Sequence, residues 1–281
     1  MSNTPTESAA EIDRTLTFIE DALQRVRACL RVSIVAMWTL ALYAARMSAL
    51  PLALINAEGE HAFRRSILRL WARGVCAIVR ARVTVRGAAP RPPFILVSNH
   101  LGYFDVIVYA RLLGAVFVSM AEVKAWPLIG MLARGLNTLF IDRKKRRDAA
   151  RVNGEIRKIV QEGYGLVLFP ESTTTYGDTL LPFRGPLLQP AIELKMPVHY
   201  AAISYRTPHN DSGFEHSICW VDDTPFATHA FRLLRLRAFD VTVIFGESPI
   251  AAGDRKQLAV SLHAAVEASM HRTEPKTPIE G

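Results

Sequence analysis

The stretch that decides the fold reads FILVSNHLGYFD and runs from Phe94 to Asp105. Its first four residues, Phe94–Val97, are apolar, follow two prolines and precede a polar pair, which is typical of a short buried strand. His100 therefore lies at the C-terminal end of a strand, where open α/β sheets expose their reactive groups.

The spacing of His100 and Asp105 requires a turn between them. Residues five apart on one continuous helix are separated by about 140° around its axis, so the two side chains would diverge. We expect Gly102 to supply the unusual backbone angles of this turn and a helix to begin at Asp105. The carboxylate then holds one imidazole nitrogen while the other accepts a proton from a substrate hydroxyl. Taken alone, the spacing also fits a structural histidine near a helix start.

Three further segments place polar residues after strand-like runs. They read GLNTLFIDR at 135–143, GLVLFPEST at 165–173 and MPVHYAAI at 196–203. Together with His100 and Asp105, they resemble the four ordered blocks of the glycerolipid acyltransferase family, whose best-known members acylate 1-acyl-glycerol-3-phosphate to phosphatidic acid. The resemblance covers roughly residues 60–250, and the ordered set is more specific than any one block.

The resemblance implies roles for individual residues. His100 is the implied general base, and Asp105 is its orienting partner. The other implied site residues contact substrate, and they are Arg143, as an anion contact, with Glu171, Ser172 and Thr173.

Two positions depart from the family pattern. Gly102 stands where many members have serine, and the third block has Ser172 and Thr174 in place of its usual glycine and arginine. The pattern implies a phosphate contact for that arginine, whose guanidinium suits bidentate phosphate binding. Either another cation takes over, with Arg184 as a candidate, or the acceptor carries a different head group.

Two acceptors follow from these observations. The more common activity of the family, formation of phosphatidic acid from lysophosphatidic acid, is the first expectation. The three consecutive threonines Thr173–Thr175, followed by a Leu-Pro-Phe segment, are more similar to the branch that includes lyso-ornithine lipid acyltransferases. That branch is the alternative.

The expected reaction is acyl transfer from an acyl thioester of CoA or acyl carrier protein to the acceptor hydroxyl. It needs no serine or cysteine nucleophile, and the chain has no GxSxG motif. Backbone amides near Gly102 or in the Ser172–Thr173 turn are candidate donors to the oxyanion. An inactive basic membrane-docking module is the alternative from another class.

Composition restricts the partners. The formal charge is +8 over 281 residues, which suits an anionic surface, either acidic lipid or nucleic acid. The five cations Arg143–Arg147 have no aromatic residues among them, which disfavours nucleic acid. The three cysteines and eight histidines show no metal-ligand spacing, so we expect no metal and no cofactor besides the acyl-thioester co-substrate.

The most apolar stretch, Val32–Ile55, suggests how the chain meets a membrane. Its uncharged first part, Val32–Ala45, reaches only about 21 Å as a helix, short of a hydrocarbon core of about 30 Å. Arginines lie on both sides, so no charge asymmetry indicates a crossing. We expect two helices, Leu23–Ile55 and His61–Val79, embedded in one leaflet at the cytoplasmic face, with arginines among anionic head groups. A single span and two helices packed on the domain itself are the alternatives.

The chain is therefore expected to be an α/β protein with a mixed, largely parallel sheet flanked by helices and an N-terminal membrane-associated two-helix motif. We expect a frayed N-terminus at 1–22, membrane-associated helices at 23–80, a catalytic domain at 81–270 and a disordered tail at 271–281. The predicted strands are Phe94–Val97, Val116–Ser119, Leu139–Ile141, Gly165–Phe169, Val198–Ser204 and Val241–Phe245.

Overall fold

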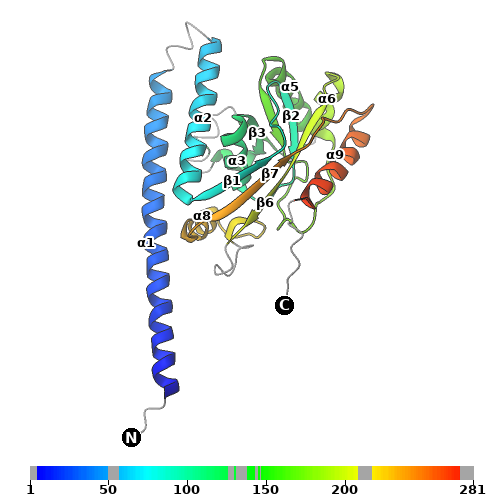
Figure 1. Cartoon of the computed structure of the whole chain (residues 1–281). Coiled ribbons are helices and arrows are strands. Elements are labelled where there is room, and N and C mark those ends of the chain that lie inside the picture. The colour runs from blue at the N-terminus through cyan, green and yellow to red at the C-terminus, as the bar shows by residue number, and fades with distance from the viewer. Residues whose placement is uncertain are drawn as a thin grey trace.

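The computed structural model describes residues 5–49, 57–125, 130, 138–142, 145, 147–207 and 217–272. Within this part of the chain, a seven-stranded sheet has the order β1-β7-β6-β2-β5-β3-β4 (Figure 1). Its strands are β1 (Ala81–Arg86), β2 (Phe94–Ser98), β3 (Val116–Met120), β4 (Leu139–Ile141), β5 (Gly165–Leu168), β6 (Val198–Arg206) and β7 (Phe239–Phe245).

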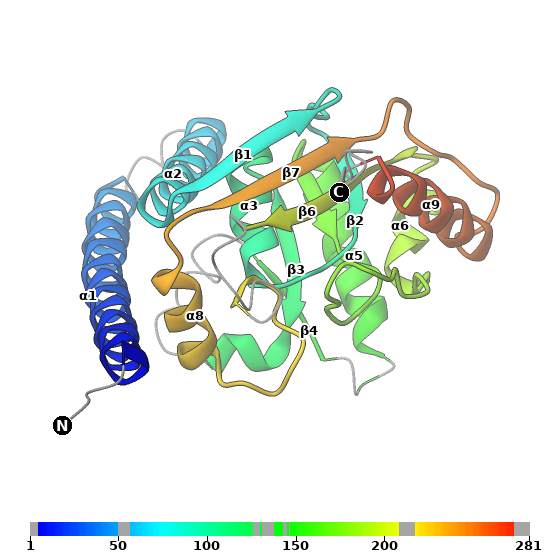
Figure 2. The same cartoon turned by 60° about the horizontal axis from the view of Figure 1, so that its bottom comes forward.

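Helices cover both faces of this sheet (Figure 2). The α-helices are α1 (Pro5–Ser48), α2 (Ala57–Val79), α3 (Tyr103–Leu113), α5 (Asp148–Gln161), α6 (Gln189–Glu193), α8 (Phe226–Arg235) and α9 (Arg255–Met270). Two short 3₁₀ helices, η2 (Ala121–Ala125) and η3 (Pro186–Leu188), lie in the connections.

The sheet is mixed and largely parallel, as predicted. In the described part of the chain, every strand pair is parallel except β6 with β7. The six predicted strands are confirmed to within a few residues at their ends. β1 was missed, although its ARVTVR sequence alternates apolar and polar residues, which is typical of a half-exposed strand at the edge of a sheet.

β2 is the central strand, and both of its faces are buried. Phe94 and Leu96 belong to the core formed with α2 and α3, whereas Ile95 and Val97 belong to the core formed with α5 and α9. A strand buried on both faces reads as a continuous apolar run, which explains the FILV signal.

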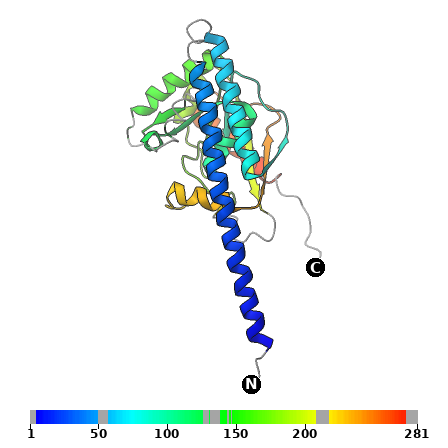
Figure 3. The ribbon, with the colours of Figure 1, turned by 90° about the vertical axis from the view of Figure 1, so that its left-hand side faces the viewer.

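α1 begins much earlier than predicted. The frayed N-terminus expected for residues 1–22 is wrong from Pro5 onward, because α1 is already helical there (Figure 3). Contacts with α8 hold part of this region, since Asp21 pairs with both Arg25 and Arg235. α1 ends at Ser48, so the predicted continuation to Ile55 falls mostly outside the described residues.

Several arginines that were expected among lipid head groups bind the protein instead. Arg31 donates to the carbonyl oxygens of Leu234, Leu236 and Arg237, and Arg27 donates to that of Arg235. These carbonyls lie at the C-terminus of α8, where helix geometry leaves them without intrahelical donors.

The second helix uses its arginines in the same way. Arg64 pairs with Glu60, which also pairs with Arg46, and Arg69 donates to the Leu113 carbonyl. Leu68 and Val75 of α2 are buried in the core of the domain. α2 therefore packs on the catalytic domain, which was the alternative to embedding for this helix.

Asn99 directly follows β2, and its side-chain amide takes the place of the next backbone partner of β6. β2 pairs with β6 up to Ser98, opposite Ala201. Beyond it, the Asn99 amide donates to the Ile203 carbonyl at 2.9 Å and accepts from the Ile203 N–H at 2.8 Å. The backbone of the turn thereby leaves the sheet while the N–H and C=O groups of Ile203 keep hydrogen-bond partners.

We predict that Asn99→Leu lowers the free energy of unfolding by about 3 kcal/mol, because two buried backbone groups of Ile203 lose their partners while the side chain keeps its branching and its number of heavy atoms. This loss corresponds to a melting temperature about 6–12 °C lower. Thermal unfolding of the full chain in detergent, followed by near-ultraviolet circular dichroism, measures it.

Asn153→Leu is the matched control. Asn153 is 9% exposed, and its amide donates one hydrogen bond, to the Pro186 carbonyl at 3.0 Å. We expect a loss of about 1 kcal/mol there. Equal losses in the two variants would contradict the role given to Asn99.

Candidate active site

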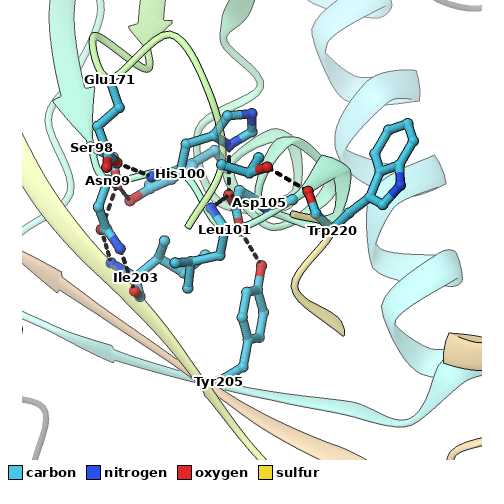
Figure 4. A network of polar contacts seen from close by, with 12 residues as sticks. Ser98, Asn99, His100, Leu101, Asp105, Glu171, Ile203, Tyr205 and Trp220 are labelled. Carbon is cyan, nitrogen blue, oxygen red and sulfur yellow. Dashed lines mark hydrogen bonds and ion pairs between the residues drawn. The ribbon is translucent and has the colours of Figure 1, made fainter. Parts of the chain in front are cut away.

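The site is centred on a buried carboxylate (Figure 4). Asp105 is fully buried, and its Oδ2 accepts hydrogen bonds from the backbone N–H groups of Leu101 at 2.7 Å and Gly102 at 3.0 Å. The same oxygen lies 2.7 Å from His100 Nδ1. Oδ1 accepts a hydrogen bond from the Tyr205 hydroxyl at 2.5 Å. The predicted pairing of His100 with Asp105 is present.

This arrangement selects the useful tautomer of His100. Because the ionised carboxylate only accepts hydrogen bonds, Nδ1 carries the proton and Nε2 keeps its lone pair. The ring stacks on Phe169 with centroids 4.1 Å apart, and the side chain is 20% exposed. No residue in the described part of the chain is hydrogen-bonded to Nε2. Nε2 is therefore free to accept a proton from a bound hydroxyl.

The turn between His100 and Asp105 differs from our expectation. Gly102 has φ 170° and ψ 179°, which is extended backbone that any residue adopts. Glycine eases the packing instead, since a Cβ there would lie 3.1 Å from the Ile218 carbonyl oxygen and 3.3 Å from the Trp220 nitrogen, which are tight contacts. α3 begins at Tyr103, so Asp105 caps its first turn and does not start it.

Glu171 links the two loops of the site. Its carboxylate is buried and accepts the His100 N–H at 2.7 Å and the Leu181 N–H at 3.0 Å. Burial raises the pKa of this carboxyl, while the two backbone donors oppose the shift. Both oxygens thus bind backbone groups, which makes Glu171 a residue that positions the catalytic loop.

The third-block threonines lie in the loop after Glu171. Ser172 has φ 66°, a left-handed conformation that favours glycine, which the family pattern has there. Thr173 is exposed. The Thr174 hydroxyl donates to the Trp220 carbonyl, so it turns inward toward the neighbouring loop.

The remaining two predicted residues have different outcomes. Arg184 is exposed, and its backbone N–H donates to the Pro170 carbonyl at 3.0 Å, which keeps it beside the third block. Arg143 lies outside the described residues, so its role stays a prediction.

Within the described ranges, no group of three metal-ligating side chains is present.

Sequence reasoning missed four contributors to the site. Tyr205 lies a hundred positions after Asp105, and Trp220 donates its backbone N–H to the Leu101 carbonyl at 2.8 Å. No pattern in the sequence around Tyr205 or Trp220 predicts these contacts. Asn99 directly precedes His100, and Phe169 lies two residues before Glu171. For Asn99, a polar residue that follows a fully apolar strand was an available hint.

The histidine, its buried carboxylate and the strand-end position suit general-base chemistry on a hydroxyl. A family model described as Acyltransferase matches residues 81–204, which include these residues. A lyso-ornithine lipid O-acyltransferase of Pseudomonas aeruginosa is 35% identical over 215 residues, covering 76% of this chain and 82% of that protein. The chain belongs to the acyltransferase family.

Two further proteins extend the comparison. A 1-acyl-sn-glycerol-3-phosphate acyltransferase of Neisseria meningitidis serogroup B is 28% identical over 183 residues, covering 64% of this chain and 70% of that protein. The crystal structure of the 1-acyl-sn-glycerophosphate acyltransferase of Thermotoga maritima aligns with a TM-score of 0.58 and 17% identity, covering 88% of this chain and 99% of that one. The structural likeness shows that the fold is shared.

We predict that His100→Ala reduces acyl transfer by about 10²–10⁴-fold, because the general base is lost, without unfolding the chain. Asp105→Asn should also lower turnover severely, since an amide orients the ring but does not stabilise an imidazolium. Thiol release from an acyl thioester, measured beside the circular dichroism spectrum of each variant, tests both. Near wild-type turnover of His100→Ala would refute the assignment.

Proposed function

We propose that this acyltransferase moves an acyl group to the free hydroxyl of a lysolipid, with lyso-ornithine lipid as the first candidate acceptor. The observation that carries the choice is Thr174, whose hydroxyl binds the Trp220 carbonyl where the family pattern has a phosphate-binding arginine. Four relatives that bear the name lyso-ornithine lipid O-acyltransferase, at 29–35% identity, support it.

In the proposed reaction, His100 Nε2 accepts the proton of the acceptor hydroxyl while that oxygen bonds to the thioester carbonyl carbon. The carbon–sulfur bond then breaks, and the imidazolium returns the proton to the departing thiolate. Asp105 stabilises the imidazolium between these steps. The donor is an acyl thioester of CoA or of acyl carrier protein, and the reaction needs no metal or other cofactor.

The structure reduces the number of backbone N–H groups that are candidate donors to the oxyanion. The backbone N–H groups of Leu101 and Gly102 both bind Asp105, so the donors expected near Gly102 are already used. The N–H groups of Thr173 and Thr174 follow the left-handed Ser172, and neither has a hydrogen-bond acceptor among the described residues. We propose these two amides as the oxyanion donors.

Lysophosphatidic acid is the second candidate acceptor. The similarity to the Neisseria 1-acyl-sn-glycerol-3-phosphate acyltransferase supports it. Arg184 also supports it, because its backbone lies beside the third block and its side chain is exposed, so that a guanidinium is available for a phosphate.

We further propose that α1 attaches the enzyme to the cytoplasmic face of an anionic membrane. Among the described residues, Arg14–Ser48 is a helix long and apolar enough to cross a membrane. From Val26 to Ser48, over about 34 Å of helix, the exposed side chains are all uncharged, because Arg27, Arg31 and Arg46 turn into the protein.

The contacts of α1 with α2 and α8 favour a helix that is embedded in one leaflet of the membrane over a helix that crosses the membrane. The charged side of α1 packs against α2 and α8, which lie beside it (Figure 3). The opposite side exposes large apolar side chains. Lipid on all sides would require α1 to leave both helices. A helix embedded by one face keeps these contacts and places the domain on the membrane surface.

We predict that Thr174→Arg increases kcat/KM for lysophosphatidic acid relative to lyso-ornithine lipid by about tenfold, because a guanidinium–phosphate pair is charge-assisted. The assay follows thiol release by the purified full chain with each lysolipid, using acyl-CoA and acyl carrier protein thioesters in parallel.

Thr174→Val is the matched control, since it breaks the bond to Trp220 without adding charge. It should leave the ratio of the two acceptors unchanged. A wild-type enzyme that prefers lysophosphatidic acid, with a ratio unaffected by Thr174→Arg, would contradict the lyso-ornithine proposal. Arg184→Ala would then be expected to raise KM for lysophosphatidic acid.

For the membrane, we predict that replacing Leu23, Leu30 and Met37 together by serine releases the chain from vesicles. These side chains are 59%, 58% and 62% exposed on one side of α1. The wild type should stay bound at about 1 M salt, because apolar burial is insensitive to a screening length of about 3 Å. Sedimentation with vesicles containing anionic lipid measures both.

Val260→Ser controls for loss of surface hydrophobicity, because Val260 is 71% exposed on α9. It should leave binding unchanged. Release of the wild-type chain by salt alone would show that charge, and not the apolar side of α1, holds the protein on the membrane.

A further inference from the structure

β6 holds both ends of the catalytic turn (Figure 4). At the start of the turn, the backbone of Ile203 binds the Asn99 amide, and at its end the side chain of Tyr205 binds the Asp105 carboxylate. β6 extends past the end of β2 and pairs there with β7, from Ala201 to Arg206. The two attachments therefore come from one strand that is fixed on its other side.

The two oxygens of Asp105 have unequal environments. Oδ2 has three neighbours that donate, namely the His100 ring and the N–H groups of Leu101 and Gly102. Among the described residues, Oδ1 accepts from the Tyr205 hydroxyl only. Tyr205 is thus the single donor to this carboxylate, in the described structure, that lies outside the turn and its histidine.

The surroundings of Tyr205 keep its hydroxyl a donor. Its ring packs edge-on against Phe104 and Phe239, with centroids 6.3 and 6.2 Å apart. Burial and the adjacent Asp105 charge raise the pKa of this phenol well above its usual range, so the proton stays on Tyr205. The hydroxyl therefore remains a hydrogen-bond donor to the carboxylate at neutral pH.

We propose that Tyr205 is a positioning residue that sets the basicity of the His100–Asp105 pair from β6. A hydrogen bond to a carboxylate favours its charged form and disperses its charge. With less charge facing Nδ1, the imidazolium is less stabilised, and more of His100 is neutral and able to act as a base. The proposal rests on His100 being the base for acyl transfer.

Other titratable groups face the pair without binding the carboxylate. Tyr109 of α3 shares a hydrogen bond with Ser98 at 2.6 Å, and Glu171 accepts the backbone N–H of His100. Cys219 contacts the Tyr176 carbonyl through its sulfur, at 3.7 Å. A change at Tyr205 alters the carboxylate directly, whereas a change at Tyr109 does not.

The test is Tyr205→Phe in the full chain, which removes the hydroxyl and keeps the ring. The acidic limb of kcat/KM, measured from about pH 5 to about pH 9, should move up by about half to one pH unit, which is about a three- to tenfold loss on that limb. Turnover at the optimum should fall by less than about tenfold.

Tyr109→Phe is the control, because it removes another fully buried hydroxyl from the same core. Its profile should superimpose on that of the wild type. A fluorinated tyrosine at position 205, which donates more strongly, should move the acidic limb down. Superimposed profiles for wild type and Tyr205→Phe, or an equal shift in Tyr109→Phe, would overturn the proposal.

A measurement without turnover separates this inference from the proposed function. The pKa of His100 is read directly by NMR of the histidine-labelled chain, with the signal assigned by its loss in His100→Gln. We expect it to rise in Tyr205→Phe and to stay constant in Tyr109→Phe. An unchanged His100 pKa refutes the inference, whereas absence of acyl transfer by the wild type refutes the function.

Discussion

The structure depends on compensating one buried negative charge. An unpaired carboxylate in the interior is costly, so Asp105 is tolerated only with donors on both oxygens. Two of these donors are consecutive backbone N–H groups, Leu101 and Gly102, which fixes the path of the turn. The third is the His100 ring, so the requirement to stabilise the charge also orients this imidazole.

The sheet supplies the rigid frame for this arrangement. His100 follows the C-terminal end of β2, two residues after Ser98. Glu171 follows the end of β5, which pairs with β2, and its carboxylate accepts the backbone N–H of His100. β6 continues beyond both strands because β7 pairs with it in the antiparallel direction. A purely parallel sheet with strands of equal length would leave Asp105 without the hydroxyl of Tyr205.

The arginines of the two N-terminal helices α1 and α2 bind the protein and thereby leave the outer side of α1 uncharged. Arg27 and Arg31 bind carbonyls at the end of α8, and Arg46 and Arg64 bind Glu60. These contacts turn positive charge toward the domain and leave the outer side of α1 apolar. The same residues that read as a basic flank in the sequence therefore permit an uncharged exposed surface.

The sequence by itself determined the central strand, the parallel arrangement and the pairing of His100 with Asp105, because apolar runs and short spacings are local properties. It also predicted Arg143 as an anion contact, and this residue lies outside the described residues. Tertiary structure alone decided that Glu171 binds backbone, that Thr174 turns toward Trp220 and that Tyr205 reaches Asp105. These contacts join segments from ten to a hundred residues apart, and the register of β6 beside β2, which no local pattern encodes, brings the most distant pair together.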